Sequence, residues 1–307
     1  MSTLHLIDGT FELFRTYHAL PKMSAPDGSE VGAIRGLIAS TLALLRNYEV
    51  SHVAVATDHV IESFRNRLFD GYKTGDGIPA DLWAQFPLAE EAYAALGIVV
   101  WPMIEFEADD ALATAAARFS GEVDRVVILS PDKDLTQCVS GDHVITVDRI
   151  RGRTYDEAGV RAKFGVGPIA IPDLLALVGD TADGIPGIAG WGAKSAAAAL
   201  SAFGNLESIP DDPQSWPAAI RNRDRLAAAL SADRQAAKLY KTLATLRRDV
   251  PLDGLVAKTT GPVPPPRPDG LQLTDLRWLG VPAGAYQALC RRLGFGDLAE
   301  RPTVWRT

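Results

Sequence analysis

Residues 126–132 read Val-Val-Ile-Leu-Ser-Pro-Asp, an apolar run that ends in a carboxylate. The runs at 4–8 and 52–58 have the same form, and residues 98–101 and 143–147 are further apolar runs. Segments with helical spacing of apolar residues separate them, at residues 31–46, 82–96 and 107–119. Continuous apolar strands that alternate with helices are typical of a parallel sheet covered on both faces. The sequence therefore predicts an α/β fold with a central parallel sheet flanked by helices.

The pattern changes after Gly165, where no strand is convincing. Short helical patterns joined by glycine and proline follow, at residues 172–178, 193–203, 218–229, 232–246 and 283–293. Residues 261–270 are rich in proline and indicate a stiff connector. A helical part is thus expected behind the α/β part.

The composition excludes several classes of protein. The chain has 307 residues, of which 47% are hydrophobic and 22% charged, so it is not a disordered chain. Two cysteines, Cys138 and Cys290, exclude a disulfide scaffold and a cysteine-based zinc site. Neither a secretory signal nor a long apolar span is visible in the sequence. We expect a cytoplasmic protein without membrane association.

The net charge of -7 is unevenly distributed along the chain. Residues 1–183 contain 27 acidic and 15 basic side chains, whereas residues 184–261 contain seven acidic and ten basic ones. An acidic front and a basic back suggest two surfaces with different functions.

Nine carboxylates lie where the predicted strands end or where helices begin. They are Asp8, Asp58, Glu107, Asp109, Asp110, Asp132, Asp134, Asp180 and Asp183. Ligands of open parallel sheets bind outside the carboxyl ends of the strands. Oxygen ligands without clustered histidine or cysteine favour Mg²⁺ or Mn²⁺, and two such ions can hydrolyse a phosphodiester. Taken singly, an Asp-Gly pair is more often part of a turn, and Asp109-Asp110 is more often the charged start of a helix. Four acidic clusters together favour a metal site.

Residues 180–200 contain a glycine-rich loop in the basic part of the chain. Gly187, Gly190 and Gly192 allow close approach of the backbone, and a helix begins at Ala193 beside Lys194. This arrangement predicts a cradle for the phosphates of nucleic acid, although a plain turn between helices is the alternative.

Ordered motifs now reveal a resemblance that runs from Leu4 to about Arg301. The chain resembles the flap endonuclease family, which includes the bacterial 5′-3′ exonuclease domain of DNA polymerase I. The motifs are Ile7-Asp8-Gly9 with Arg15 and Tyr17-His18, Asp58 with Ser63-Phe64-Arg65, Gly71-Tyr72-Lys73, Glu107-Ala108-Asp109-Asp110, Asp132-Lys133-Asp134-Leu135, Gly179-Asp180 with Asp183-Gly184-Ile185-Pro186-Gly187, and Arg292-Leu293-Gly294-Phe295-Gly296.

The resemblance implies three parts. Residues 1–165 would form the metal-dependent nuclease core, with a helical arch at about 66–95. Residues 166–260 would form a DNA-binding region with a helix–three-turn–helix element, and residues 261–307 a connector and a terminal helix packing back on the core. Because the sequence ends at Thr307, we expect a free-standing nuclease, and we also expect it to be a monomer.

The resemblance also implies the chemistry and the residues that perform it. Two or three divalent ions would hydrolyse DNA at 5′ ends, 5′ flaps or nicks, and possible substrates include RNA–DNA hybrids. One ion would be held by Asp8, Asp58, Glu107 and Asp109, and another by Asp132, Asp134 and Asp183, with Asp110 and Asp180 nearby. Lys73 and Arg65 would contact the scissile phosphate, with Lys73 as an electrostatic clamp. Arg15 and Tyr72 would contact DNA, and K⁺ would join the loop at 187–192 to a phosphate.

One segment departs from the family pattern. Residues 74–92 contain no lysine or arginine, although the family arch is usually basic. Other classes are a toxin-type ribonuclease, which lacks the glycine loop, and a non-catalytic binder of branched DNA, which predicts missing metal ligands. A phosphatase is a weaker alternative, because Asp8 lacks a second aspartate two residues later.

Overall fold

The computed structural model describes residues 2–47, 50–252 and 270–306. By their internal contacts these residues divide into two compact units. Unit 1 comprises residues 1–61, 75–130 and 248–307, and unit 2 comprises residues 62–74 and 131–247. Within the described residues, no helix combines the length and the hydrophobicity that a membrane span needs.

Unit 1 is an α/β unit in which strands alternate with helices. Its strands are β1 (Thr3–Asp8), β2 (His52–Asp58), β3 (Val99–Met103), β4 (Arg125–Leu129), β7 (Val281–Pro282) and β8 (Trp305–Arg306). Its helices are α1 (Gly9–Ala19), α2 (Gly32–Asn47), α3 (Ala80–Trp83), α4 (Phe86–Ala95), α5 (Ala108–Phe119) and α11 (Ala283–Leu293).

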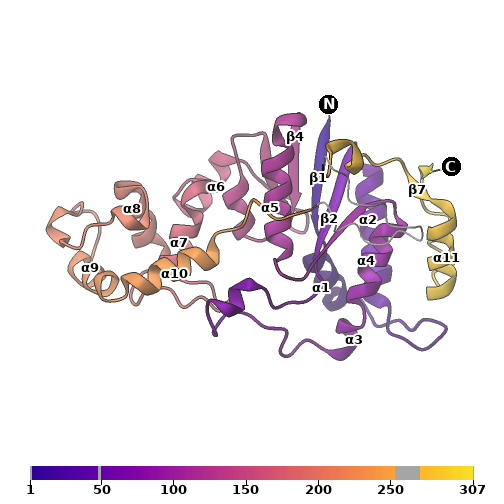
Figure 1. Cartoon of the computed structure of the whole chain (residues 1–307), viewed down its shortest axis with the longest axis horizontal. Coiled ribbons are helices and arrows are strands. Elements are labelled where there is room, and N and C mark those ends of the chain that lie inside the picture. The colour runs from indigo at the N-terminus through magenta and orange to yellow at the C-terminus, as the bar shows by residue number, and fades with distance from the viewer. Residues whose placement is uncertain (1, 48–49, 253–269, 307) are drawn as a thin grey trace. The chain divides into compact units, whose positions relative to one another are not determined.

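The sheet of unit 1 is parallel, with neighbouring strands in the order β3-β2-β1-β4. Its strands are almost completely buried, as continuous apolar runs require. Helix α5 covers one face, and α1, α2 and α4 lie on the other (Figure 1). The chain reverses its direction across the sheet between β3 and β4, so right-handed crossovers place α5 opposite the earlier helices. The predicted parallel sheet is confirmed.

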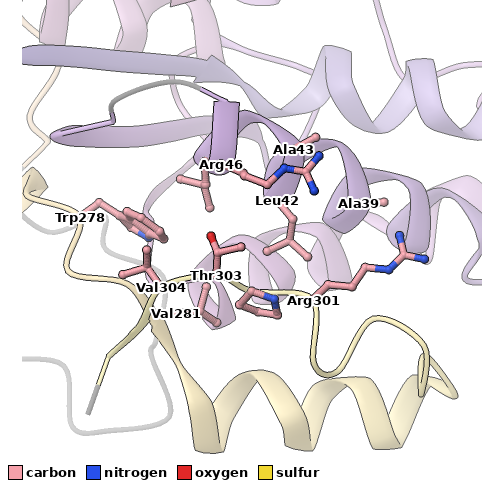
Figure 2. A pocket seen from close by; sticks show the side chains of 11 residues that line it. Ala39, Leu42, Ala43, Arg46, Trp278, Val281, Arg301, Thr303 and Val304 are labelled. Atoms are coloured by element: carbon pink, nitrogen blue, oxygen red, sulfur yellow. The ribbon is translucent and has the colours of Figure 1, made fainter.

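A pocket of about 200 Å³ lies between α2 and the C-terminal segment of unit 1. Figure 2 shows Leu42 and Arg46 of α2 on one side of it, and Trp278 and Arg301 on the other. None of the nine carboxylates lines this pocket, so it is separate from the candidate metal site.

Unit 2 is mainly helical. It contains the antiparallel strands β5 (Val144–Asp148) and β6 (Arg153–Tyr155), the helices α6 (Glu157–Phe164), α7 (Ile171–Val178), α8 (Ala193–Phe203), α9 (Arg223–Ala232) and α10 (Arg234–Ala244), and the short 3-10 helices Phe64–Arg67 and Asp134–Cys138. Helix α7 packs against α8 and α10. Trp191 and Trp216 are buried in this core with ring centroids 5.8 Å apart.

The structure adds elements that the sequence pattern does not reveal, namely α1, α3, α6, β6, β7 and β8, and the two short strands β7 and β8 lie after Gly165, where no strand is expected. The segment expected as an arch divides at residue 75, because residues 62–74 belong to unit 2 and the following ones to unit 1. Phe86 of this segment is buried and packs on Trp83 at 4.7 Å, as core residues do. Most of the proline-rich connector at 261–270 lies outside the described residues.

Candidate functional site

Asp8 ends β1 and caps the helix that follows it. Its Oδ1 accepts a hydrogen bond from the Phe11 backbone N–H at 2.9 Å, which satisfies a free donor at the start of α1. Its Oδ2 accepts from the Ser130 hydroxyl at 2.8 Å, just beyond the end of β4. The carboxylate is only 6% exposed and is therefore held in a fixed orientation at the sheet edge.

Asp58 ends the neighbouring strand β2, which pairs with β1 in parallel register, so both aspartates leave the same edge. The Oδ1 atom of Asp58 accepts from the Ala108 backbone N–H at 2.8 Å. This bond ties the first turn of α5 to Asp58 and brings Glu107 and Asp109 to the same edge. Unit 1 therefore carries the first predicted ligand set near this sheet edge, whereas the acids of the described residues whose oxygens lie within 4.8 Å of one another belong to unit 2.

Asp110 has a more structural setting than the other carboxylates of unit 1. It is fully buried, and its Oδ2 accepts from the backbone N–H of Glu107 at 3.0 Å. A carboxylate in this position caps the helix start, so the structural interpretation of Asp110 is supported beside the metal-binding one.

In unit 2, a tight loop presents Asp180 and Asp183. The backbones of Asp180 and Ile185 exchange two hydrogen bonds of 2.8 Å, which close the loop. Gly184 has a φ of +76°, and a Cβ atom there would lie 2.1 Å from the Gly71 carbonyl oxygen. Glycine is needed at this position, and the segment that carries Lys73 lies directly on the loop.

Asp134 completes a cluster with these two residues. Carboxylate oxygens of Asp134, Asp180 and Asp183 all lie within 4.8 Å of one another. Among the described residues, the buried Oδ1 of Asp134 accepts no hydrogen bond. Three oxygen ligands with an unsatisfied buried acceptor fit a hard divalent cation such as Mg²⁺ or Mn²⁺. Asp132 is exposed, and its Oδ1 accepts from the Asp134 backbone N–H at 2.8 Å.

The charges of this cluster perturb one another. Burial, together with the neighbouring carboxylates of Asp132 and Asp183, raises the pKa of Asp134 well above its usual value. Lys133 is the cation among these acids: its Nζ donates to Asp180 Oδ2 and lies 3.5 Å from Asp134 Oδ1. Burial alone would lower the pKa of Lys133, but the adjacent carboxylates outweigh it and raise the pKa. Lys133 is therefore a charged ammonium group.

Lys73 also belongs to this cluster. Its Nζ lies 3.0 Å from Asp183 Oδ1, and its backbone N–H donates to the Asp183 carbonyl at 3.0 Å. The side chain is 27% exposed, so it borders the cluster at the surface of the unit. A cation at this position is suitably placed to meet an anionic group that approaches Asp183.

Arg65 and Tyr72 occupy different environments from the one that phosphate contact requires. Arg65 is 1% exposed, and its guanidinium donates to the backbone carbonyls of Leu243 at 2.7 Å and Thr245 at 3.2 Å. These carbonyls end α10, where backbone acceptors lack helical partners. Tyr72 is 3% exposed and packs in the core of unit 2. In this conformation both side chains are shielded from solvent.

The glycine loop faces a groove of about 720 Å³ within unit 2. Gly190, Gly192 and Lys194 line it together with Arg221 and Asn222. Gly187 has a φ of +71°, and a Cβ atom there would lie 2.5 Å from the Gly179 nitrogen. Gly192 has neither constraint, since its φ is -135° and no atom lies within 4 Å of a Cβ position. Only part of the glycine pattern is thus sterically required.

Arg15, which the family motifs assign to DNA, lies on α1 in unit 1. Its guanidinium pairs with Glu12 Oε2 at 2.5 Å and donates to the Ser40 hydroxyl at 2.9 Å. The side chain is 26% exposed. Arg15 therefore has intramolecular partners here, and contact with a substrate would compete with them.

Three basic residues near the clusters and the groove are not revealed by sequence reasoning. Lys133 stands inside the motif Asp132-Lys133-Asp134-Leu135, but the spacing of this motif alone does not show that Lys133 pairs with Asp180. Arg221 lines the groove, and the Arg225 guanidinium lies within 3.0 Å of the position a Cβ of Gly190 would occupy. The three arginines at 221, 223 and 225 are the sequence signal that could have indicated further positive charge at the groove.

The fold, the acids at its strand ends and the carboxylate cluster of unit 2 indicate a class of nucleases, and comparisons with known proteins agree. Residues 3–165 match the family of 5′-3′ exonuclease N-terminal, resolvase-like domains. Residues 166–263 match the 5′-3′ exonuclease C-terminal SAM fold. The chain belongs to the 5′-3′ exonuclease family, which confirms the family that the motifs predict.

Curated relatives include a protein of similar length and much longer ones. The 5′-3′ exonuclease of Aquifex aeolicus is 35% identical over 210 residues, which cover 68% of this chain and 72% of that protein. DNA polymerase I of Pseudomonas aeruginosa is 38% identical over 260 residues, covering 81% of this chain and 28% of the polymerase. The chain thus spans less than a third of that polymerase's length.

Solved structures share the fold at lower identity. The T5 5′-exonuclease with bound zinc ions has a TM-score of 0.66 at 21% identity, with 79% of this chain and 89% of that chain covered. The catalytic core of Rad2 in complex with DNA substrate has a TM-score of 0.58 at 17% identity, with 95% and 88% covered. At these identities the likeness establishes the fold, including the helical C-terminal part.

Proposed function

We propose that this chain is a structure-specific 5′ nuclease that hydrolyses DNA phosphodiesters at 5′ ends and 5′ flaps. The observation that carries the proposal is the cluster of Asp134, Asp180 and Asp183, whose oxygens lie within 4.8 Å of one another. Its residues stand in the motifs that resemble the family's metal ligands. A role in DNA replication and repair follows from such an activity.

The divalent ions are Mg²⁺ or Mn²⁺, two or three in number. In unit 1 the ligands are Asp8, Asp58, Glu107 and Asp109, and in unit 2 they are Asp132, Asp134, Asp180 and Asp183. Bound ions of this kind supply an activated water and neutralise charge on the phosphodiester. The protein holds the ligands through the bonds from Phe11, Ser130 and Ala108, which fix the carboxylates before an ion arrives.

Lys73 is the electrostatic clamp on the phosphate. Its pairing with Asp183 keeps the ammonium group beside the cluster, and its partial exposure leaves a path for an incoming anion. A positive charge fixed where negative charge develops lowers the barrier without a proton transfer. We assign Arg65 and Tyr72 to positioning of the segment that carries Lys73, since both side chains are buried.

The groove of unit 2 binds the phosphate backbone of duplex DNA. Gly190 and Gly192 line it without side chains, Lys194 and Arg221 line it with positive charge, and the Arg225 guanidinium lies beside Gly190. Such contacts read the backbone and not the base sequence. A K⁺ ion between the loop and a phosphate is part of this proposal, in line with the family resemblance. A protein of similar fold, the T5 flap endonuclease, forms a pseudo-enzyme–product complex with DNA and metal ions.

The segment at 75–92 contributes little electrostatic attraction for the DNA substrate. Its acid Asp81 accepts a hydrogen bond from the Tyr17 hydroxyl at 2.8 Å and pairs with Lys22 at 2.6 Å. These contacts tie the segment to α1 and the loop after it. We propose that substrate selection depends more on the unit 2 groove than on this segment, and that the protein acts as a monomer on nicks, flaps or RNA–DNA hybrids.

A cleavage assay tests the proposal. A 5′-labelled flap duplex is incubated with Mg²⁺ or Mn²⁺ and the natural protein, Asp132→Asn, or the control Asp142→Asn, which replaces an exposed aspartate of the same unit. We expect product from the natural protein and the control, strong loss with Asp132→Asn, and none with EDTA. Equal product from Asp132→Asn would refute the assignment of that ligand. Binding without cleavage by the natural protein would identify a non-catalytic binder of branched DNA.

A further inference from the structure

Lys133 lies inside the carboxylate cluster of unit 2. It stands between two of the acids in sequence, Asp132 and Asp134, and its ammonium group pairs with Asp180 and faces Asp134 at 3.5 Å. The side chain remains 34% exposed. This lysine therefore contacts two of the three residues whose oxygens could hold an ion.

The charge balance of the cluster has a direct consequence for metal binding. Three carboxylates, those of Asp134, Asp180 and Asp183, are paired with two ammonium groups, from Lys133 and Lys73. The Lys133 ammonium, which donates to Asp180 Oδ2 and faces Asp134 Oδ1, repels an incoming divalent cation and occupies an oxygen lone pair of Asp180 that the cation would use.

We propose that Lys133 is an internal counter-ion that occupies the cation position of the unit 2 cluster in the metal-free protein, and that a divalent ion binds by displacing it. The inference rests on the proposed metal site. Lys133 is thus a residue that sets the divalent-ion concentration at which the site fills. It holds the acids together before the metal arrives and is not itself a catalytic residue.

The lysine side chain is suited to such an exchange. Its ammonium is a compact charge on a flexible four-carbon stem, so it can leave two carboxylates without moving the backbone. An arginine would be less easily displaced, because its planar group makes paired hydrogen bonds to carboxylates. Lys73 differs in that its backbone also binds Asp183, which keeps it beside the cluster.

The test is Mn²⁺ binding by the metal-free full chain. Binding is measured by electron paramagnetic resonance, which detects free Mn²⁺, and by calorimetry. The variants are Lys133→Met and Lys133→Arg, with Lys238→Met as a control that removes an exposed lysine from the same unit. We expect one Mn²⁺ site to bind at least about tenfold more tightly in Lys133→Met, and no change in Lys238→Met. Lys133→Arg should bind Mn²⁺ more weakly than the natural protein.

Thermal unfolding adds a second readout, the increase in melting temperature caused by Mn²⁺, which a purely structural role of Lys133 would not change. Lys133→Met should lower the melting temperature of the metal-free protein, because the acids lose their counter-ion, and should enlarge the increase caused by Mn²⁺. If Lys133→Met fails to fold, Lys133→Gln serves the same purpose. Equal or weaker Mn²⁺ binding after loss of the lysine charge would overturn the inference. Failure of the natural protein to bind Mn²⁺, with no difference from Asp183→Asn, would instead overturn the proposed metal site.

Discussion

Arg65 offers a prediction that separates a structural from a catalytic role. The residue stands in a motif that resembles phosphate-contacting residues, yet its side chain is 1% exposed and donates to the carbonyls of Leu243 and Thr245. We predict that Arg65→Met, which keeps an unbranched apolar stem of similar length, mainly destabilises unit 2. Arg65→Lys, which keeps the charge but not the planar donor group, should have a smaller effect.

The magnitude follows from the bonds that are lost. Each hydrogen bond from a charged donor contributes about 1.5–3 kcal/mol, and an acceptor left unpaired in the interior adds to the loss. Two such bonds give an expected decrease of about 3–5 kcal/mol in the free energy of unfolding for Arg65→Met. The contact of the buried guanidinium with the Phe64 ring, 4.6 Å from its centroid, adds about 2 kcal/mol to what is lost.

Urea unfolding measures this loss, with circular dichroism and tryptophan fluorescence as two probes, since Trp191 and Trp216 report on unit 2. Cleavage is then measured at a temperature where the variant is folded. A structural role predicts a large loss of stability and near-normal cleavage per folded molecule. If the free energy of unfolding of Arg65→Met stayed within about 0.5 kcal/mol of the natural value while kcat fell strongly, the structural role would be refuted. Such a result would support contact between Arg65 and the scissile phosphate.

Three other predictions concern the sheet and the groove. His5 is 3% exposed, and burial lowers its pKa to about 4 from 6.5; the unfolded chain therefore takes up a proton first, and stability is lost as the pH falls from about 6.5 to 4. The pKa shift corresponds to about 3 kcal/mol of free energy of unfolding. Between pH 7 and pH 4, urea unfolding should therefore show a decrease in this free energy that is about 3 kcal/mol smaller for His5→Leu than for the natural protein. Equal decreases in the two proteins would contradict the assignment. Gly187→Ala should destabilise the protein by at least about 2 kcal/mol because of its positive φ and the nearby Gly179 backbone, whereas Gly192→Ala should have little effect on thermal unfolding. Lys194→Ala should weaken duplex binding and reduce the salt dependence of the binding constant by about one phosphate contact, and an unchanged slope in a titration with NaCl would count against the groove.

The sequence predicts the sheet of unit 1 well because its strands are short apolar runs with little ambiguity. Val126 to Leu129, for example, are all buried in β4. Helix α1 is harder to predict, because polar and apolar residues are mixed and its start depends on the cap that Asp8 provides. Strand β6 has three half-exposed or exposed residues and pairs only with β5, so its sequence carries no apolar signal.

The candidate site is predictable for a different reason. Carboxylates at strand ends are visible in the sequence, and the parallel topology brings those of unit 1 to one edge. The roles of the basic residues depend instead on contacts between distant segments. Arg65 meets carbonyls 178 and 180 residues away, and Lys133 meets Asp180, 47 residues away. No local pattern encodes whether such a cation is buried on the backbone, paired with an acid or available to a phosphate.

The central claim is the proposed metal-dependent cleavage of 5′-ended DNA, for which unit 1 and unit 2 each supply carboxylates. Single-turnover cleavage of a 5′-labelled flap duplex at saturating Mn²⁺ tests it, with Asp58→Asn from unit 1, Asp183→Asn from unit 2 and the control Asp142→Asn. Loss of a ligand should remove several kcal/mol of charge stabilisation, so each site variant should cleave about a thousandfold more slowly or worse. The control should keep the natural rate. A site variant from either unit that cleaves at the natural rate would contradict the account.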